Sequence, residues 1–203
     1  MSSCSWRARI VLNLKNIEYE YAPVNIRDKQ QQKDDSYTEI NPNQKVPTLS
    51  IDEMDISESM VICNYLDKKY PDPPLYPTDE LMNIRVQEVC EYINSSIQPL
   101  QNIGVIEKVK QEGNISQTKW ASFFIRKGLT AVDTRIKPFR GVCSFGNDPT
   151  MADVFLYPQI SHARRFEIDV ESEFPMLYKI EQHLHTIEEF QNARPEHQID
   201  ATS

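Results

Sequence analysis

The chain has 203 residues, enough for one domain or two, and its 39% hydrophobic and 26% charged residues are typical of a globular protein. Its formal net charge is −8. An acidic surface repels phosphate backbones and anionic headgroups, so we expect neither nucleic acid nor a membrane surface as a partner. No apolar run approaches the roughly 18–20 residues that a bilayer-spanning helix needs.

Cysteine usage points to a reducing compartment. The sequence has 4 cysteines with neither CxxC nor metal-ligand spacing, so we predict free thiols and a cytoplasmic protein. They are Cys4, Cys63, Cys90 and Cys143. Residues 1–17 carry basic residues and serines but no acid, which loosely resembles a mitochondrial presequence and leaves mitochondrial import as the alternative.

The first part of the chain mixes helix and strand patterns. Apolar residues at helical spacing predict a short helix over residues 5–16. An alternating, aromatic-rich run predicts a strand over 19–24. The polar stretch 28–35 has no periodic signal and is expected to be a loop or a weak helix.

Two further elements complete this part. Apolar runs at 45–51 and 54–56 flank Asp52-Glu53 and predict a hairpin. Helical spacing of Val61, Ile62, Tyr65 and Leu66 then predicts a helix that ends before the next proline. The pattern is that of a small α/β domain over residues 1–70.

A proline-rich segment separates this domain from the rest. Residues 71–77 read PDPPLYP, and proline lacks an amide N–H and constrains its predecessor, so a helix cannot continue through them. We predict a domain linker there and an all-α domain over 78–203. The expected helices follow apolar residues at Met82 to Leu100, Ile125 to Ile136, and Leu177 to Ile187 after Pro175.

The sharpest helix start is Thr150-Met151-Ala152-Asp153. The Thr150 side chain can accept from the N–H three residues on, and the Asp153 side chain can reach back to the N–H of Thr150. We interpret this capping box as structural, with no role in chemistry.

The first residues form the leading candidate for a functional site. A helix start leaves N–H groups unpaired and carries a partial positive charge, so it stabilises a thiolate or a bound anion. Ser2, Ser3 and Cys4 lie at such a start, and Arg7 lies one turn further on. The plain alternative is an N-cap serine followed by a small buried cysteine.

Two later features fit an extended ligand. A cis Val46-Pro47 bond would expose the Val46 backbone for pairing, whereas an ordinary trans proline would merely open a strand. Glu58 and Ser59 stand at a helix start, where they either bind a ligand carboxylate or only cap the helix.

Several motifs, in one order along the whole chain, resemble the glutathione transferases, and within them the zeta class or maleylacetoacetate isomerases. The SSCSWRARI run at 2–10 and the IQPLQN run at 97–102 are specific to that class. The NPNQKVPTL run at 41–49, Glu58-Ser59 and the TMAD run at 150–153 are shared more widely in the superfamily.

The resemblance implies glutathione transferase architecture, with a thioredoxin-like N-terminal domain before an all-α domain, glutathione as cofactor and a homodimer. It implies that glutathione thiolate adds to the cis double bond of maleylacetoacetate, allows rotation and leaves to give fumarylacetoacetate, in tyrosine and phenylalanine breakdown. Such chemistry needs a stabilised thiolate and a cationic hold on the substrate carboxylate.

The resemblance also assigns site residues. Ser2 matches the serine that stabilises the thiolate, with Ser3 and Cys4 completing the catalytic motif. The substrate carboxylate is assigned to Arg165, with Arg7 as a second candidate, although a surface ion pair explains either arginine equally well. Glutathione contacts are assigned to Ser2, Ser3, Cys4, Ser5, Trp6, Arg7, Gln32, Val46, Glu58, Ser59, Gln98, Asn102, Ile103 and Gly104.

Other chemistries find less support. His183 and His185 are two apart and cannot share a helix face, and HExxH and GxSxG motifs are absent, so we expect neither a metal centre nor a serine hydrolase. The competing hypotheses are a transferase or dehalogenase for small α-halo acids, a non-catalytic glutathione-transferase-like module, and a thiol-disulfide role for Cys4.

In the family the serine motif follows a first β-strand, whereas here Ser2 directly follows Met1. That strand would lie between the one expected at 19–24 and the hairpin. Without it, unpaired buried groups would cost about 1–3 kcal/mol each. Either the sequence begins too late or the form is shortened, so activity is a conditional expectation.

Overall fold

The computed structural model describes residues 2–201, which fall into two compact units. Of the described residues, 2–73 and 188–201 form one unit and 74–187 form the other. The sequence predicts an all-α domain over 78–203, whereas in the structure the segment from residue 188 belongs to the first unit. This difference arises because α10 packs on α1, as described below.

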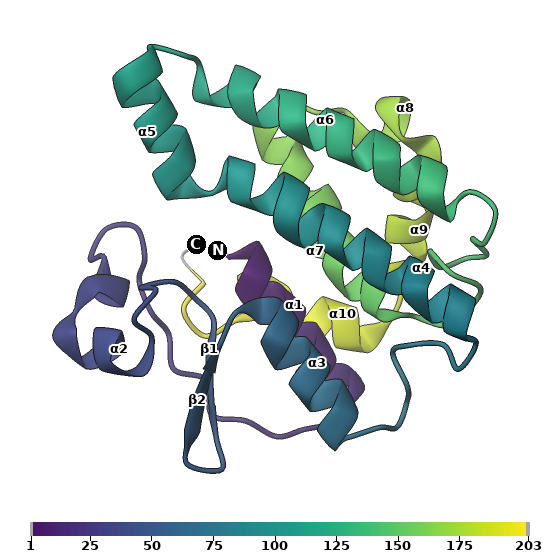
Figure 1. The fold of residues 1–203 in the computed structure, drawn as a ribbon, viewed down its shortest axis with the longest axis horizontal. Helices are drawn as coiled ribbons and strands as arrows, with labels where there is room; N and C mark the ends of the chain where they lie inside the picture. The colour runs from purple at the N-terminus through teal and green to yellow at the C-terminus, as the bar shows by residue number, and fades with distance from the viewer. Residues whose placement is uncertain (1, 202–203) are drawn as a thin grey trace. The chain divides into compact units, whose positions relative to one another are not determined.

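The first unit contains short helices, 3-10 turns (η) and one hairpin (Figure 1). Its elements are α1 (Ser3–Leu14), η1 (Gln31–Lys33), α2 (Asp35–Ile40), β1 (Thr48–Ile51), β2 (Met54–Ser57), α3 (Ser59–Lys69), α10 (Glu188–Asn192) and η5 (Pro195–His197). The helix predicted over 5–16 is therefore confirmed as α1, and the polar stretch after residue 28 forms η1 and α2.

The predicted hairpin is also confirmed. Strands β1 and β2 pair antiparallel, with Thr48 opposite Ser57 and Ile51 opposite Met54, and they form a sheet of 2 strands. Asp52 and Glu53 make the turn with φ of 51° and 61°. Two successive positive φ values match the twist of the flanking strands, which explains the tight connection.

The strand predicted over 19–24 is not formed, because within residues 2–201 no other strand lies beside it to make a ladder. The alternating pattern survives in side-chain contacts instead. The Tyr21 hydroxyl donates to Asp200 at 2.9 Å, and the Arg9 guanidinium lies 6.0 Å from the Tyr21 ring centroid. This segment thus anchors the C-terminal residues of the unit.

Helix α1 is the centre of the first unit and packs against α3 and α10 (Figure 1). Ile10 and Val11 are fully buried. The buried Lys15 ammonium donates to Asp67 at 2.6 Å, which ties the end of α1 to α3. The Asn13 amide donates to the Glu189 carbonyl at 2.9 Å, so the C-terminal segment also holds this helix.

The second unit is helical. Its elements are α4 (Glu80–Glu91), the π-helical turn η2 (Tyr92–Ile97), η3 (Gln98–Gln101), α5 (Ile103–Gly113), α6 (Gln117–Ile136), α7 (Met151–Ala163), η4 (Arg164–Phe166), α8 (Val170–Glu173) and α9 (Pro175–Leu184). The long helix expected from Met82 to Leu100 is therefore broken into three pieces, and Pro99, inside η3, has no N–H to continue an α-helical ladder.

Apolar residues chosen by spacing form the core of this unit. Val86, Val89, Ile93 and Ile97 are fully buried, as are Ile125, Leu129, Val132 and Ile136 of α6. Gly128 lets α6 approach η2 closely, because a Cβ at that position would overlap the Ile97 side chain. The packing is thus set by one small residue as well as by the apolar pattern.

The capping box at α7 is confirmed. The N–H of Thr150 donates to Asp153 at 2.8 Å, and the Thr150 hydroxyl donates to the same carboxylate at 2.9 Å. Asp153 also accepts from the N–H of Ser144 at 2.8 Å and is fully buried. The Met151 N–H donates to the Leu75 carbonyl, which attaches the end of the proline-rich segment to α7.

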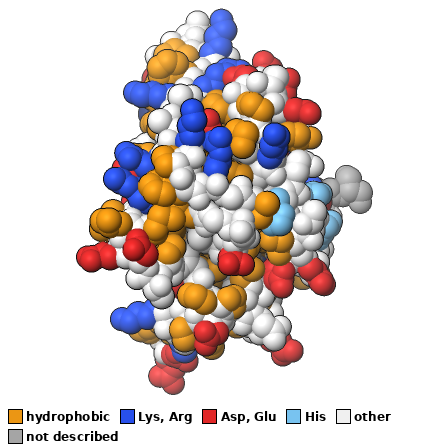
Figure 2. Space-filling model, turned by 90° about the vertical axis from the view of Figure 1, so that its right-hand side faces the viewer, with side chains coloured by type: hydrophobic (Ala, Val, Ile, Leu, Met, Phe, Trp, Pro, Cys, Tyr) orange, Lys and Arg blue, Asp and Glu red, His pale blue; other side chains and the backbone are white. Residues whose placement is uncertain are grey.

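Surface charge is mixed. Figure 2 shows Lys, Arg, Asp and Glu side chains interspersed with hydrophobic ones over the face it draws. No helix within residues 2–201 is long and apolar enough to cross a bilayer.

Candidate functional site

The start of α1 carries the predicted catalytic residues. Ser2 is the N-cap, with an extended backbone, and its Oγ accepts from the N–H of Ser5 at 3.2 Å. The Ser2 carbonyl accepts from the N–H of Trp6, while the N–H groups of Ser3 and Cys4 have no acceptor within residues 2–201. Such unpaired donors favour an anion.

Two cysteines near the start of α1 differ in solvent exposure. Cys4 is a free, partly exposed thiol on the first turn of α1. Cys63 of α3 is fully buried, and burial raises the pKa of its thiol to about 12, although the Arg7 charge lowers it. Only Cys4 of this pair is therefore available to chemistry.

The start of α3 is linked to α1 by an arginine. Arg7 is fully buried, and its Nη1 donates to Ser59 Oγ at 3.1 Å. Ser59 is itself only 4% exposed. A fully buried guanidinium does not face a substrate, so this position does not favour the hypothesis that Arg7 holds the substrate carboxylate.

Glu58 is the N-cap residue of α3, but its side chain does not cap the helix. Its backbone is in the positive-φ region at 68°, which is uncommon for a residue with a side chain, and the N-cap makes no side-chain capping hydrogen bond. Instead the exposed carboxylate accepts from the Asn43 amide at 2.8 Å. Neither predicted residue therefore satisfies the first N–H groups of α3, which remain suited to a carboxylate.

The loop before β1 presents the Val46 backbone. The Val46-Pro47 peptide bond is cis. Asn41 is buried and its amide donates to the Lys45 carbonyl at 2.7 Å and to Thr48 Oγ1 at 3.0 Å, which fixes the loop on both sides. The backbone of Val46 itself has no hydrogen-bond partner within residues 2–201.

Gln32 lies on η1, apart from the two helix starts in sequence. Its Oε1 is buried without a hydrogen-bond partner among the described residues, whereas the neighbouring Gln31 accepts from the N–H of Asn25 at 2.8 Å. A buried unpaired amide oxygen is costly, and a ligand donor would satisfy it.

The remaining predicted residues belong to the helical unit. Gln98 opens η3, and Asn102 caps α5 by accepting from the N–H of Gly104 at 3.2 Å. Ile103 is 37% exposed at the first position of α5. Arg165 lies exposed on η4. The motif at 97–102 is thus a turn between helices, and Asn102 has a structural task there.

Sequence reasoning missed two polar pairs. In the motif at 97–102 the buried amide is Gln101, whose Nε2 donates to Gln159 Oε1 at 2.7 Å. Beside Arg165, it is Arg164 that forms a two-pronged ion pair, with Glu181 at 2.6 and 2.5 Å. Gln159 lies in α7, where Met151 to Ile160 are all buried, and no local sequence signal predicted its pairing with Gln101.

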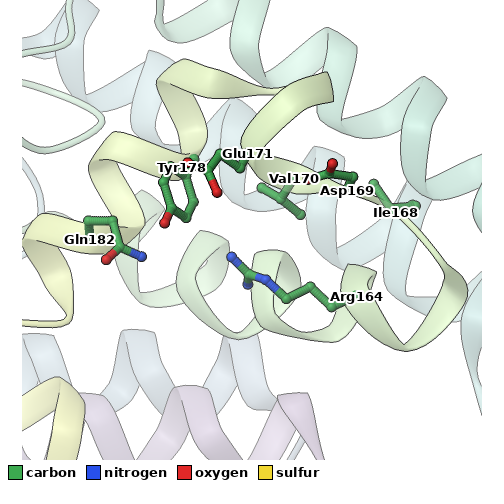
Figure 3. A pocket seen from close by; sticks show the side chains of 7 residues that line it. All are labelled: Arg164, Ile168, Asp169, Val170, Glu171, Tyr178 and Gln182. Atoms are coloured by element: carbon green, nitrogen blue, oxygen red, sulfur yellow. The ribbon is translucent and has the colours of Figure 1, made fainter.

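Arg164 also lines a surface cavity of about 330 Å³ with Tyr178 and Gln182, and Figure 3 shows the three side chains converging. Glu171 lies beside Tyr178 and Asp169 lies further along the rim, and both add negative charge to the cavity. With Glu181 holding Arg164, the charge balance does not favour an anion there. No group of three or more His, Cys, Asp or Glu in residues 2–201 is placed to hold a metal ion.

Comparisons with known proteins identify the family of the chain. The model of the glutathione S-transferase N-terminal domain matches residues 1–69. The chain is 40% identical to mouse maleylacetoacetate isomerase, over 98% of this chain and 91% of the relative. It is 39% identical to a zeta-class glutathione S-transferase of Euphorbia esula, over 100% and 90%.

A solved structure supports the same relationship. A maleylacetoacetate isomerase from Anaeromyxobacter dehalogenans 2CP-1, with GSH bound in its active site, matches with a TM-score of 0.89 and 35% identity. The match covers 99% of this chain and 94% of that one. The expected architecture, a thioredoxin-like domain followed by a helical domain, is confirmed.

Proposed function

The chain belongs to the family of zeta-class glutathione transferases and maleylacetoacetate isomerases, and on that basis we propose that it isomerises maleylacetoacetate to fumarylacetoacetate with glutathione as cofactor. The observation that carries the proposal is the start of α1, where a half-buried serine caps a helix whose first N–H groups lack acceptors. The reaction would serve tyrosine and phenylalanine breakdown.

The donors of the first unit fit the parts of glutathione. The start of α1 suits a sulfur anion, the free backbone of Val46 suits the peptide backbone of an extended ligand, and Ser59 with the start of α3 suits a carboxylate. Bound glutathione supplies the thiolate nucleophile that converts the substrate's double bond transiently into a single bond.

Ser2 is the proposed thiolate-stabilising residue. Its Oγ already accepts from the Ser5 N–H, so its own O–H proton is free to be donated to sulfur. Ser3 and Cys4 contribute their N–H groups to the same anion. Because Ser2 also fixes the first turn, the donors are oriented before the ligand arrives.

On the substrate side we propose Arg165 for the substrate carboxylate, since it is exposed whereas Arg7 is buried. Gln98, Asn102, Ile103 and Gly104 are proposed to contact glutathione from the helical unit, and Gln32 from η1. We also propose a cytoplasmic homodimer. Leu81 and Ile84 of α4 are 74% and 50% exposed at neighbouring helical positions, which suits association with a second copy.

The test is conversion of maleylacetoacetate by the purified chain, with and without glutathione. We expect turnover only with the thiol, and turnover that does not need it would contradict the proposal. Dichloroacetate assayed in parallel separates an isomerase from a dehalogenase. Failure to bind immobilised glutathione would favour the non-catalytic module.

A further inference from the structure

The feature that carries a further inference is the buried pair of Arg7 and Ser59. The two residues come from different helices, 52 positions apart, and join the starts of α1 and α3 through a 3.1 Å hydrogen bond. Arg7 is 0% exposed and Ser59 is 4% exposed. A buried guanidinium is costly to place, so its orientation toward this hydroxyl calls for a physical explanation.

The direction of the bond is fixed by chemistry. A guanidinium has only donors, so Ser59 Oγ must be the acceptor. The Ser59 O–H proton is then left to be donated, and within residues 2–201 it has no acceptor. The neighbouring N–H groups at the start of α3 are donors as well, so the missing partner must be an acceptor.

The surroundings select a negatively charged acceptor. A hydroxyl that accepts from a cation is polarised and becomes a stronger donor. The helix start adds a partial positive charge, and the Glu58 carboxylate is engaged by Asn43 at 2.8 Å rather than capping α3. Burial keeps the Arg7 charge poorly screened by water and salt.

We infer that Arg7 is a positioning residue, which orients and polarises the Ser59 hydroxyl so that it donates to a carboxylate of the bound tripeptide. The inference rests on the proposed function, because glutathione supplies that carboxylate, which the family resemblance implies is the one at its γ-glutamyl end. It also gives Arg7 a different task from that of Arg165, since Arg7 acts through Ser59 and not on the substrate.

The test is a double-variant cycle on the full chain, with glutathione dissociation constants measured by calorimetry. Ser59→Ala is expected to raise Kd about 10–100-fold, the value of a hydrogen bond to a charged group. Arg7→Gln is expected to raise Kd several-fold. The double variant is expected to match Ser59→Ala alone, because Arg7 acts only through that hydroxyl.

Arg9→Gln is the matched control. Arg9 is a second buried arginine of α1, but its Nε donates to the Ala193 carbonyl at 2.9 Å, away from Ser59. We expect it to leave Kd unchanged. Arg7→Lys keeps the charge with a single point donor and should raise Kd less than Arg7→Gln, which gives a second reading where the neutral variant does not fold.

The outcomes separate the two claims. Glutathione amidated at its γ-glutamyl α-carboxylate should bind the parent chain weakly and should show no further loss in Ser59→Ala or Arg7→Gln. Kd factors for Arg7 and Ser59 that multiply in the double variant, or normal binding by both Arg7→Gln and Arg7→Lys, would overturn the inference alone. A parent chain that binds no glutathione would overturn the proposed function as well.

Discussion

Helices α1 and α7 both begin with a hydroxyl residue at the N-cap, but the protein pairs the hydrogen-bond donors at the α7 start more fully than those at the α1 start. At α7 the buried Asp153 carboxylate takes two N–H groups and the Thr150 hydroxyl. At α1 the Ser2 side chain takes only the Ser5 N–H.

The difference shows how the same local chemistry can serve stability or binding. A helix start whose first N–H groups are mostly paired within the protein, as Met151 and Asp153 are in α7, holds the fold together and has little left for a ligand. A helix start whose first N–H groups remain unpaired is less stable, but it can bind an anion.

The largest expected effect is a loss of stability when the hydrogen bonds at the start of α7 are removed. Asp153→Ala should lower the free energy of unfolding by about 3–5 kcal/mol, because it leaves buried donors of Ser144 and Thr150 without an acceptor. Urea denaturation measures this. Asp148→Ala, at an exposed position nearby, should change it by less than about 0.5 kcal/mol. Equal stability of the two variants would refute the structural role.

A substitution at the start of α1 should lower activity far more than stability. Ser2→Ala is expected to lower kcat/KM about 10²–10³-fold, the typical cost of losing one donor to a developing anion. The free energy of unfolding should fall by only about 1 kcal/mol, the value of an N-cap. Steady-state kinetics and urea denaturation on the same sample distinguish the two. A loss of stability that accounts for the lost activity would remove the catalytic assignment.

The start of α6 supplies a control, because its capping serine has no proposed role in binding or catalysis. Ser116 caps α6 by accepting from the N–H of Lys119 at 3.3 Å, and it lies outside the proposed site. Ser116→Ala should cost about 1 kcal/mol of stability, as Ser2→Ala does, with kcat/KM unchanged. If Ser116→Ala lowered kcat/KM as much as Ser2→Ala, the assignment of Ser2 would not stand.

The smallest expected effect is a difference in thiol reactivity between Cys4 and the buried cysteines. Burial raises the pKa of Cys143 to about 12, as it does for Cys63. A raised thiol pKa lowers the thiolate fraction, so at pH 8 only about one molecule in 10⁴ carries either thiolate. A disulfide reagent should therefore label Cys4 first in the native protein and all four thiols after unfolding. Fast labelling of native Cys4→Ala protein would contradict this.

The strand predicted at 19–24 is not formed, which shows that a local sequence pattern does not suffice to make a strand. Its alternating aromatic pattern satisfies the propensity for a strand, but a strand exists only where a neighbour completes its hydrogen bonds. Here Tyr21 instead bonds to Asp200, 179 positions away. No pattern within the segment contained that partner.

The sequence by itself determined the helix starts, the hairpin turn and the apolar faces of α4 and α6, because these depend on residues a few positions apart. It also placed Ser2, Ser59 and Val46 as site candidates through the family motifs. Only the tertiary structure decided that Arg7 is buried and bonds to Ser59, that the Glu58 side chain bonds to Asn43 and does not cap α3, and that residues 188–201 return to α1. Those facts depend on which distant groups meet in the core, and burial, hydrogen-bond satisfaction and charge pairing are settled only there.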